Sequence, residues 1–268
     1  MKLRYTWEVL YQEIDADKRM RLVALENHLL IVAGKAADEY GFGQQYLFKQ
    51  GLTWIITHCS IEMQELPQAN DVIVFETWVE SNAHMLSTRD FRIYKDTGYW
   101  DPGWEELDEK EMEAKRILIG KAKTTWAVLD LTKREIVNVF DQQVFQDIVD
   151  GEVLDMPRPS RMIPFNTTTP DAQSTIHTQQ STILYSSVDY NNHCNSCKYP
   201  EFMLNVYKPD WLSKPFRFDI RYVHEMKLGQ TIETAVKVEE KKVCYQQKDE
   251  TGRIVCSAQI ESLQKGEC

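Results

Sequence analysis

Asp189, Asn191 and His193 place a carboxylate, an amide and an imidazole at alternate positions of the short polar stretch VDYNNHC. On an extended backbone, alternate side chains point to the same face, so we expect these three groups to lie together. A helical pattern follows, and the first N–H groups of a helix favour negative charge. An imidazole beside a carboxylate can move protons, and amide donors can stabilise an oxyanion. The stretch therefore predicts a site for acid–base or hydrolytic chemistry.

Cys194 and Cys197 lie in the same stretch and raise three other interpretations. A zinc site needs four N or S ligands, and His193 with the two cysteines supplies three at most. A thioredoxin-like redox pair needs a parallel βαβ context, whereas the surrounding runs alternate as antiparallel strands do. A polar turn that caps the next helix through Asn191 or Asn195 is the plain structural interpretation. We expect no metal and no cofactor.

The stretch belongs to one half of a repeated pattern. Residues 6–22 and 181–197 both predict a strand followed by a turn, and Asp15 aligns with Asp189. Residues 61–80 and 220–239 align without a gap, which brings Asn70-Asp71 and Gly229-Gln230 together at a turn between strands. The first half has Asp17 and Arg19 where the second half has the amide and the imidazole. Only the second half is therefore expected to carry the chemistry.

Each half begins with a strand, continues with one helix and ends with several antiparallel strands. In the first half, apolar residues recur at helical spacing from Leu22 to about Tyr40. One helix packed on a curved antiparallel sheet is an α+β arrangement of the hotdog type. Two copies predict a double hotdog.

The pattern also predicts where the domains divide. We expect an N-terminal hotdog domain at residues 1–140, a linker at 141–175 that includes four prolines, and a C-terminal hotdog domain at 176–268. An irregular segment at about 97–116 interrupts the first half, and its charged run is typical of a solvated helix or hairpin tip.

Composition excludes several classes of protein. The chain has 268 residues, enough for one or two domains, and its formal net charge of −10 argues against a nucleic-acid binder. The opening residues lack a signal-peptide core, and no apolar run approaches the roughly 20 residues that cross a bilayer. Six cysteines without a targeting signal predict reduced thiols. We expect a cytoplasmic protein with no membrane insertion.

The stretch SSVDYNNHCNSCKYPEFMLN, residues 186–205, resembles the acyl-acyl-carrier-protein (acyl-ACP) thioesterase family of plants and bacteria. In that family an Asp-x-Asn-x-His segment is followed by Asn and an aromatic residue, here Asn195 and Tyr199. The later segment RYVHEMKLGQTIE is similar to the family's Tyr-x-x-Glu segment, and Glu225 falls on its catalytic glutamate. The resemblance covers nearly the whole chain outside 97–116 and looks like that of a bacterial member. It implies four catalytic residues: Asp189, Asn191, His193 and Glu225.

The resemblance implies a hydrolase of fatty acid biosynthesis that cleaves the thioester of fatty acyl-ACP. The products would be free fatty acid and holo-ACP, and the partner would be the carrier with its phosphopantetheine-linked acyl chain. The acyl chain is expected in the first half, under the helix of residues 22–40. The sequence does not decide between a monomer and a homodimer.

The sequence departs from the plant members at Met226, where they have a cysteine after the glutamate. A thioether cannot act as a thiolate nucleophile. Water activation is then assigned to Glu225 or Asp189, with His193 polarising the water or relaying its proton. Two other roles for Asp189 stay open: orienting His193, or attacking the thioester itself as a nucleophile. Asn191 would position the water or hold the thioester oxygen.

Three other functions stay open: an acyl-CoA thioesterase, a hotdog dehydratase and a non-catalytic acyl-binding protein. Both the chain and the carrier are acidic, so docking would use local cations. The candidates, on composition alone, are Arg158, Arg161, Lys198, Lys208, Lys214 and Arg217.

Overall fold

The computed structural model describes residues 1–157, 159, 162, 164–165 and 175–264. The chain divides into two compact units, which are described separately. Unit 1 comprises Met1–Ile55 and Met63–Met156, and unit 2 comprises Ile56–Glu62 and Pro157–Cys268.

Unit 1 is built on antiparallel strands in the order β1-β3-β4-β5. Their bounds are β1 Leu3–Glu8, β3 Val72–Ala83, β4 Leu86–Asp96 and β5 Arg116–Asp130. The short strand β6, Ile136–Val137, pairs with β5, while β2, Leu52–Met63, contributes residues to both units. The central strands of this sheet are rich in β-branched and aromatic residues that suit a half-buried pleated surface.

Unit 2 repeats this order with antiparallel strands β7-β9-β10-β11-β8. Their bounds are β7 Thr175–Thr182, β8 Phe216–Tyr222, β9 Thr231–Val238, β10 Lys242–Lys248 and β11 Ile254–Ser262. The first strand of each unit pairs with the third, so the two units share one topology. This sharing confirms the predicted double hotdog.

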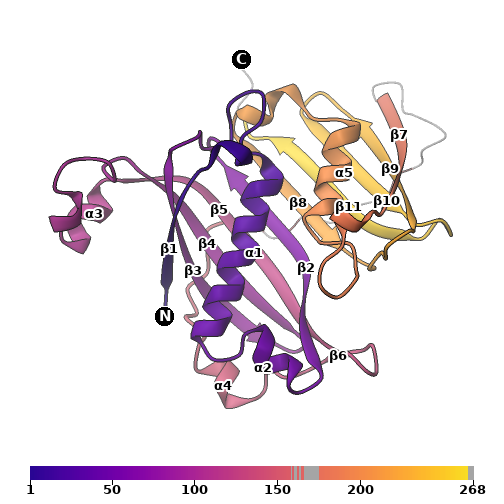
Figure 1. Cartoon of the computed structure of the whole chain (residues 1–268), viewed down its shortest axis with the longest axis horizontal. Coiled ribbons are helices and arrows are strands. Elements are labelled where there is room, and N and C mark those ends of the chain that lie inside the picture. The colour runs from indigo at the N-terminus through magenta and orange to yellow at the C-terminus, as the bar shows by residue number, and fades with distance from the viewer. Residues whose placement is uncertain (158, 160–161, 163, 166–174, 265–268) are drawn as a thin grey trace. The chain divides into compact units, whose positions relative to one another are not determined.

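Each unit carries one principal helix on its sheet, α1 (Leu22–Glu39) in unit 1 and α5 (Lys198–Val206) in unit 2 (Figure 1). The apolar positions of α1 recur on one stripe that is buried and contacts β3. The helix ends where Gly41 takes a φ of +86°, a left-handed conformation that suits glycine after a helix. The spacing in the sequence predicted this helix correctly.

The two expected turns between strands occupy matching places. Asn70 has a φ of +67° and Gly229 a φ of +85°, a backbone conformation that asparagine and glycine tolerate better than other residues. Each precedes the third strand of its unit, β3 or β9. The gapless alignment of the two segments therefore has the correct register.

The irregular segment of the first half forms a 3₁₀ turn, Trp104–Glu106, and the helix α3, Glu109–Ala114. Asp108 caps α3 by accepting a hydrogen bond from the N–H of Glu111, whose side chain accepts one from the N–H of Asp108. The predicted solvated helix is therefore present.

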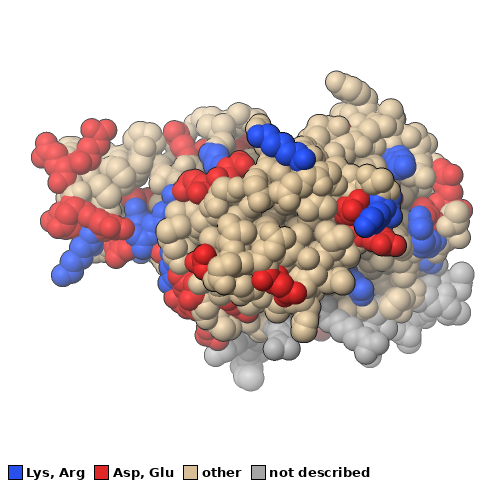
Figure 2. All heavy atoms as spheres, turned by 90° about the horizontal axis from the view of Figure 1, so that it is seen from below, with Lys and Arg blue, Asp and Glu red and all other residues tan. Residues whose placement is uncertain are grey.

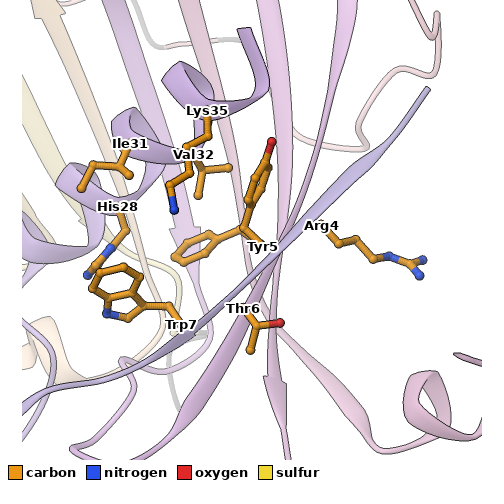
Figure 3. Close-up of a pocket in the computed structure, with 9 residues that line it drawn as sticks. Arg4, Tyr5, Thr6, Trp7, His28, Ile31, Val32 and Lys35 are labelled. Carbon is orange, nitrogen blue, oxygen red and sulfur yellow. The ribbon is translucent and has the colours of Figure 1, made fainter. Parts of the chain in front are cut away.

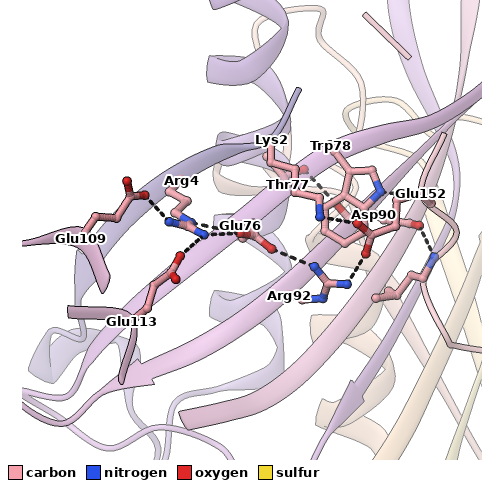
Figure 4. Close-up of polar contacts among 11 residues, drawn as sticks. Lys2, Arg4, Glu76, Thr77, Trp78, Asp90, Arg92, Glu109, Glu113 and Glu152 are labelled. Atoms are coloured by element: carbon pink, nitrogen blue, oxygen red, sulfur yellow. Dashed lines mark hydrogen bonds and ion pairs between the residues drawn. The ribbon is translucent and has the colours of Figure 1, made fainter. Parts of the chain in front are cut away.

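A network of charged side chains ties α3 and the segment around Glu152 to the sheet of unit 1 (Figure 4). Glu76 is nearly buried and accepts from both Arg4 and Arg92. Arg4 also pairs with Glu109 and Glu113 of α3, while Arg92 also pairs with Glu152. Such a network is well satisfied, because each buried charge has an opposite charge and a hydrogen bond.

Asp90 of β4 is completely buried, accepts the N–H of Leu154 at 3.0 Å and lies 3.1 Å from the Nζ of Lys123. Burial, together with the neighbouring Glu80, raises the pKa of the Asp90 carboxyl to about 7. The folded state therefore binds more protons than the unfolded chain between about pH 4 and pH 7. The stability that Asp90 contributes is present at low pH and is lost as the pH rises through about 7.

We predict that Asp90→Asn becomes more stable relative to the parent as the pH is raised from about 5 to about 8, because the amide has no charge to desolvate. Urea unfolding of both proteins across this range measures the difference. A difference in the free energy of unfolding that stays constant with pH would contradict the assignment.

Candidate active site

The predicted site residues 189–193 form a tight turn, which we call the site turn. Val188 and Cys194 bridge its ends, Asp189 donates its N–H to the carbonyl of His193 at 2.8 Å, and Asn192 has a φ of +61°. Asp189 Oδ1 accepts the N–H groups of Asn191 and His193 at 2.8 and 3.2 Å. The prediction of an extended backbone here is therefore wrong, because the Asp189 carboxylate accepts N–H groups two and four residues ahead and holds the backbone in a turn.

Unit 1 contains the same turn at residues 15–19. Asp15 donates its N–H to the carbonyl of Arg19 at 2.8 Å, and Asp15 Oδ1 accepts from the N–H groups of Asp17 and Arg19 at 2.9 and 3.3 Å. Lys18 has a φ of +61°, as Asn192 has in the other half. The aspartate at the first position therefore builds the turn in both halves, whether or not an imidazole follows.

Glu225 reaches the site turn from the irregular backbone after β8. The N–H groups of Val223 and His224 both donate to the carbonyl of Val255, so the regular ladder ends there. The chain then pairs with the site turn, because Cys194 donates its N–H to the carbonyl of Met226 at 2.7 Å and His193 bridges Lys227. This pairing holds residue 225 beside residue 193.

His193 and Glu225 come together as predicted. Nδ1 of His193 lies 3.3 Å from Oε2 of Glu225, with the two side chains 22% and 40% exposed. A carboxylate beside Nδ1 selects the imidazole tautomer that carries its proton on that nitrogen and leaves Nε2 as an acceptor. The pair is therefore open to solvent and can exchange protons with a bound molecule.

Asn191 and Asn195 have different surroundings in the same segment. The side chain of Asn191 is half-buried and hydrogen-bonds to that of Tyr190, at the rim of the site turn. The side chain of Asn195 accepts the N–H of Cys197 at 3.0 Å and closes the start of α5. Asn195 therefore shapes the turn before α5, while the N-cap residue of the helix is Cys197, which has no side-chain cap.

The two cysteines beside the site turn, Cys194 and Cys197, are buried thiols outside any disulfide. Burial raises the pKa of the Cys194 thiol to about 12, which keeps it protonated at neutral pH. Among the residues with described positions, no group of three or more His, Cys, Asp or Glu side chains could hold a metal ion.

Tyr199 lies close to Glu225, and the sequence predicted no role for it. Tyr199, in the first turn of α5, is 3% exposed, and its hydroxyl oxygen accepts the N–H of Met226 at 3.1 Å. The signal in the sequence is the contrast with Leu25, which occupies the matching place before the second turn of α1.

The candidate docking cations differ in their availability. The prediction of Arg217 as a docking cation is wrong, because its side chain is buried and pairs with Asp219 at 2.8 Å and Glu62 at 2.9 Å. Lys198 is half-buried and pairs with Glu201, while Lys208 and Lys214 are exposed. Arg158 and Arg161 lie outside the described residues.

Charge on the face drawn in Figure 2 is mixed, with blue Lys and Arg side chains lying among red Asp and Glu side chains. This face shows no broad basic surface. Over the described part of the chain, no helix is long and apolar enough to span a membrane.

We predict that Asp189→Ala lowers the free energy of unfolding by about 1–2 kcal/mol, because two backbone N–H groups lose their acceptor. Asp15→Ala is the matched variant and should lower it by a similar amount. Asp189→Asn keeps an acceptor oxygen and should change stability by less than about 0.5 kcal/mol. Urea unfolding measures all three, and an equal loss in Asp189→Asn and Asp189→Ala would contradict the turn-building role.

We predict that iodoacetamide alkylates Cys194 of the folded protein at about pH 8 at least about 100-fold more slowly than in the unfolded chain, where thiols titrate near their ordinary value. Burial and the raised pKa both remove reactive thiolate. Mass spectrometry of the peptide that contains Cys194 measures the rate. Similar rates in the two states would show an accessible, reactive thiol instead.

The chain matches two family models along most of its length. The model described as the acyl-ACP thioesterase N-terminal domain matches residues 1–100, and the model described as the C-terminal domain matches residues 170–264. These ranges cover the first hotdog up to the insertion and nearly all of the second.

Curated relatives agree over part of their length. An oleoyl-acyl carrier protein thioesterase from Coriandrum sativum is 25% identical over 156 residues, which are 56% of this chain and 36% of that protein. A palmitoyl-acyl carrier protein thioesterase from Arabidopsis thaliana is 26% identical over 34% of this chain and 23% of that protein. The matched region thus spans about a third or less of these chloroplast proteins.

Solved structures are similar over nearly the whole chain. An acyl-ACP thioesterase from Bacteroides thetaiotaomicron has a TM-score of 0.77 at 25% identity, with 97% of both chains covered. A 12:0-ACP thioesterase from Umbellularia californica has a TM-score of 0.76 at 17% identity, with 97% of this chain and 96% of that chain covered, and it supports the fold. With the two family models, these similarities show that the chain belongs to the acyl-ACP thioesterase family.

Proposed function

We propose that this protein hydrolyses the thioester of fatty acyl-ACP, releasing free fatty acid and holo-ACP. The observation that carries the proposal is the contact of His193 Nδ1 with Glu225 Oε2 at 3.3 Å, at the turn position where the first half has Arg19 instead of an imidazole. The names of the family models and of the relatives supply the substrate class.

Glu225 is the carboxylate that we assign to water activation. Asp189 Oδ1 already accepts two backbone N–H groups in the site turn, a role that Asp15 shares in the other half, where Arg19 takes the place of His193. Glu225 has no such duplicate, and its side chain is 40% exposed. A general base of this kind contributes about 10²–10⁴-fold to a rate.

In the proposed reaction, Glu225 takes a proton from water through His193. The water proton passes to Nε2 of His193 and the Nδ1 proton passes to Glu225, while the water oxygen attacks the thioester carbonyl carbon. The negative charge that develops on the carbonyl oxygen is held by the amide of Asn191. When the C–S bond breaks, Glu225 returns a proton to Nδ1 of His193, and Nε2 passes its proton to the departing sulfur. The products are a carboxylic acid and the pantetheine thiol, and both residues return to their starting state.

We place the acyl chain in unit 1, against α1. A cavity of about 220 Å³ lies there between β1 and α1 (Figure 3). Tyr5 and Trp7 point from β1 towards the helix, where Val32 and the sheet residue Phe75 complete the apolar wall. Arg4, Thr6, His28 and Lys35 also line this cavity, so only its aromatic and aliphatic part suits the methylene groups of a fatty acyl chain.

The carrier is the proposed protein partner. The exposed Lys208 and Lys214 are the docking cations that we retain for an acidic carrier. Ion pairs of exposed lysines affect the association rate more than the final affinity, so docking should weaken as salt is added.

We predict that the protein releases free acid from acyl-ACP and that His193→Ala and Glu225→Gln each lower kcat/KM by about 10²–10⁴-fold. Arg19→Ala changes the matching position of the first half and should leave kcat/KM near that of the parent. The assay measures acid release over a panel of medium-chain to long-chain acyl-ACP substrates.

Two further sets of substrates in the same assay distinguish the proposed acyl-ACP thioesterase from the alternative enzymes. Acyl-CoA substrates of the same chain lengths test for a CoA thioesterase, and 3-hydroxyacyl-ACP tests for a dehydratase that forms an unsaturated product without acid release. Binding of acyl-ACP without any turnover would indicate an acyl-binding protein, and would overturn the proposal.

A further inference from the structure

The hydroxyl of Tyr199 bonds to the peptide groups on both sides of Glu225. Its oxygen accepts the N–H of Met226 at 3.1 Å, and it donates to the carbonyl of His224 at 3.5 Å. Tyr199 is 3% exposed, and burial raises the pKa of its phenol, so that it keeps its proton and can donate and accept at once.

Tyr199 is itself held firmly on the sheet of unit 2. Its carbonyl accepts a hydrogen bond from Nε2 of Gln247 at 3.0 Å, and the same nitrogen donates to Oγ1 of Thr234 at 3.1 Å. Gln247 lies on β10, Thr234 on β9, and both are fully buried. The phenol therefore connects the backbone around Glu225 to the rigid part of the unit.

The half without the imidazole lacks both partners of this contact. Met20 donates its N–H to the carbonyl of Pro67 at 2.6 Å, as Cys194 donates to the carbonyl of Met226 at 2.7 Å, so the two segments match. Pro67 has no N–H to donate, and Leu25, aligned with Tyr199, has no hydroxyl to accept one. The hydroxyl and its N–H partner thus occur together, and only beside Glu225.

We propose that Tyr199 is a positioning residue that holds Glu225 at the distance its carboxylate needs to share a proton with His193. The inference rests on the proposed thioester hydrolysis. Glu225 has an irregular backbone and an exposed side chain, and the Tyr199 hydroxyl bonds to both of its flanking peptide groups. Its contact with His193, at 3.3 Å, is already near the upper limit for a hydrogen bond.

The variant Tyr199→Phe removes only the hydroxyl, and Tyr245→Phe is its matched control. Tyr245 is 2% exposed in the same unit and donates its hydroxyl to the carbonyl of Tyr207 at 2.9 Å, away from the site turn. We expect Tyr199→Phe to lower kcat by about 10- to 100-fold with KM nearly unchanged, because displacement of a catalytic group by about 1 Å costs up to 10²-fold. Tyr245→Phe should keep the parent kcat even where it lowers the melting temperature equally.

A double-mutant cycle with Glu225→Gln separates positioning from general stability. If Tyr199 acts through Glu225, adding Tyr199→Phe to Glu225→Gln lowers kcat no further. Full additivity, or equal kcat losses in Tyr199→Phe and Tyr245→Phe, would overturn the inference while leaving the hydrolase in place. A parent protein without acid release would instead overturn the proposed function. If Tyr199→Phe does not fold, Gln247→Met, which releases the Tyr199 carbonyl, must reproduce the kcat loss and the missing additivity.

Discussion

The hydrogen bond from the N–H of Cys194 to the carbonyl of Met226, at 2.7 Å, is the contact on which the site depends. It joins a turn and the end of a strand that lie more than thirty residues apart in the chain. Once the two backbones are paired, His193 and Glu225 are neighbours, and their side chains lie 3.3 Å apart. The energy that holds them comes from the buried sheet and helix on either side, whose formation offsets the entropy of closing so long a loop.

The same pairing exists in the other half, between Met20 and Pro67. The two halves therefore share the same backbone scaffold, whichever side chains it carries: a turn closed by aspartate, a backbone hydrogen bond and a helix. What differs is a small set of side chains placed on it. An imidazole stands where the first half has arginine, and a glutamate where it has Leu66. A duplicated fold can in this way keep one half for chemistry and leave the other for binding.

Burial separates groups of the same type into structural and reactive ones. One carboxylate oxygen of Asp189 accepts two backbone N–H groups of its own turn, and burial raises the pKa of the Cys194 thiol so that it stays protonated. Both residues nevertheless lie beside the imidazole. Asp90, deep in the other unit, binds its proton more tightly than an ordinary aspartate because ionisation there is unfavourable. Glu225, by contrast, has a side chain that is 40% exposed. This exposure suits the role in proton transfer that we propose for Glu225.

Local patterns in the sequence were sufficient for the repeated architecture, the helix α1, the turns at Asn70 and Gly229, and the restriction of the imidazole to the second half. These features depend on spacing and on backbone preference, which neighbouring residues decide. The resemblance to the family added Glu225. The tertiary structure alone decided that Asp189 turns back on its own backbone, that Arg217 is buried against Asp219, and that Tyr199 reaches the peptide groups around Glu225. Each of these depends on which way a side chain turns and on how segments distant in the chain pair, and residue type at a position does not encode either.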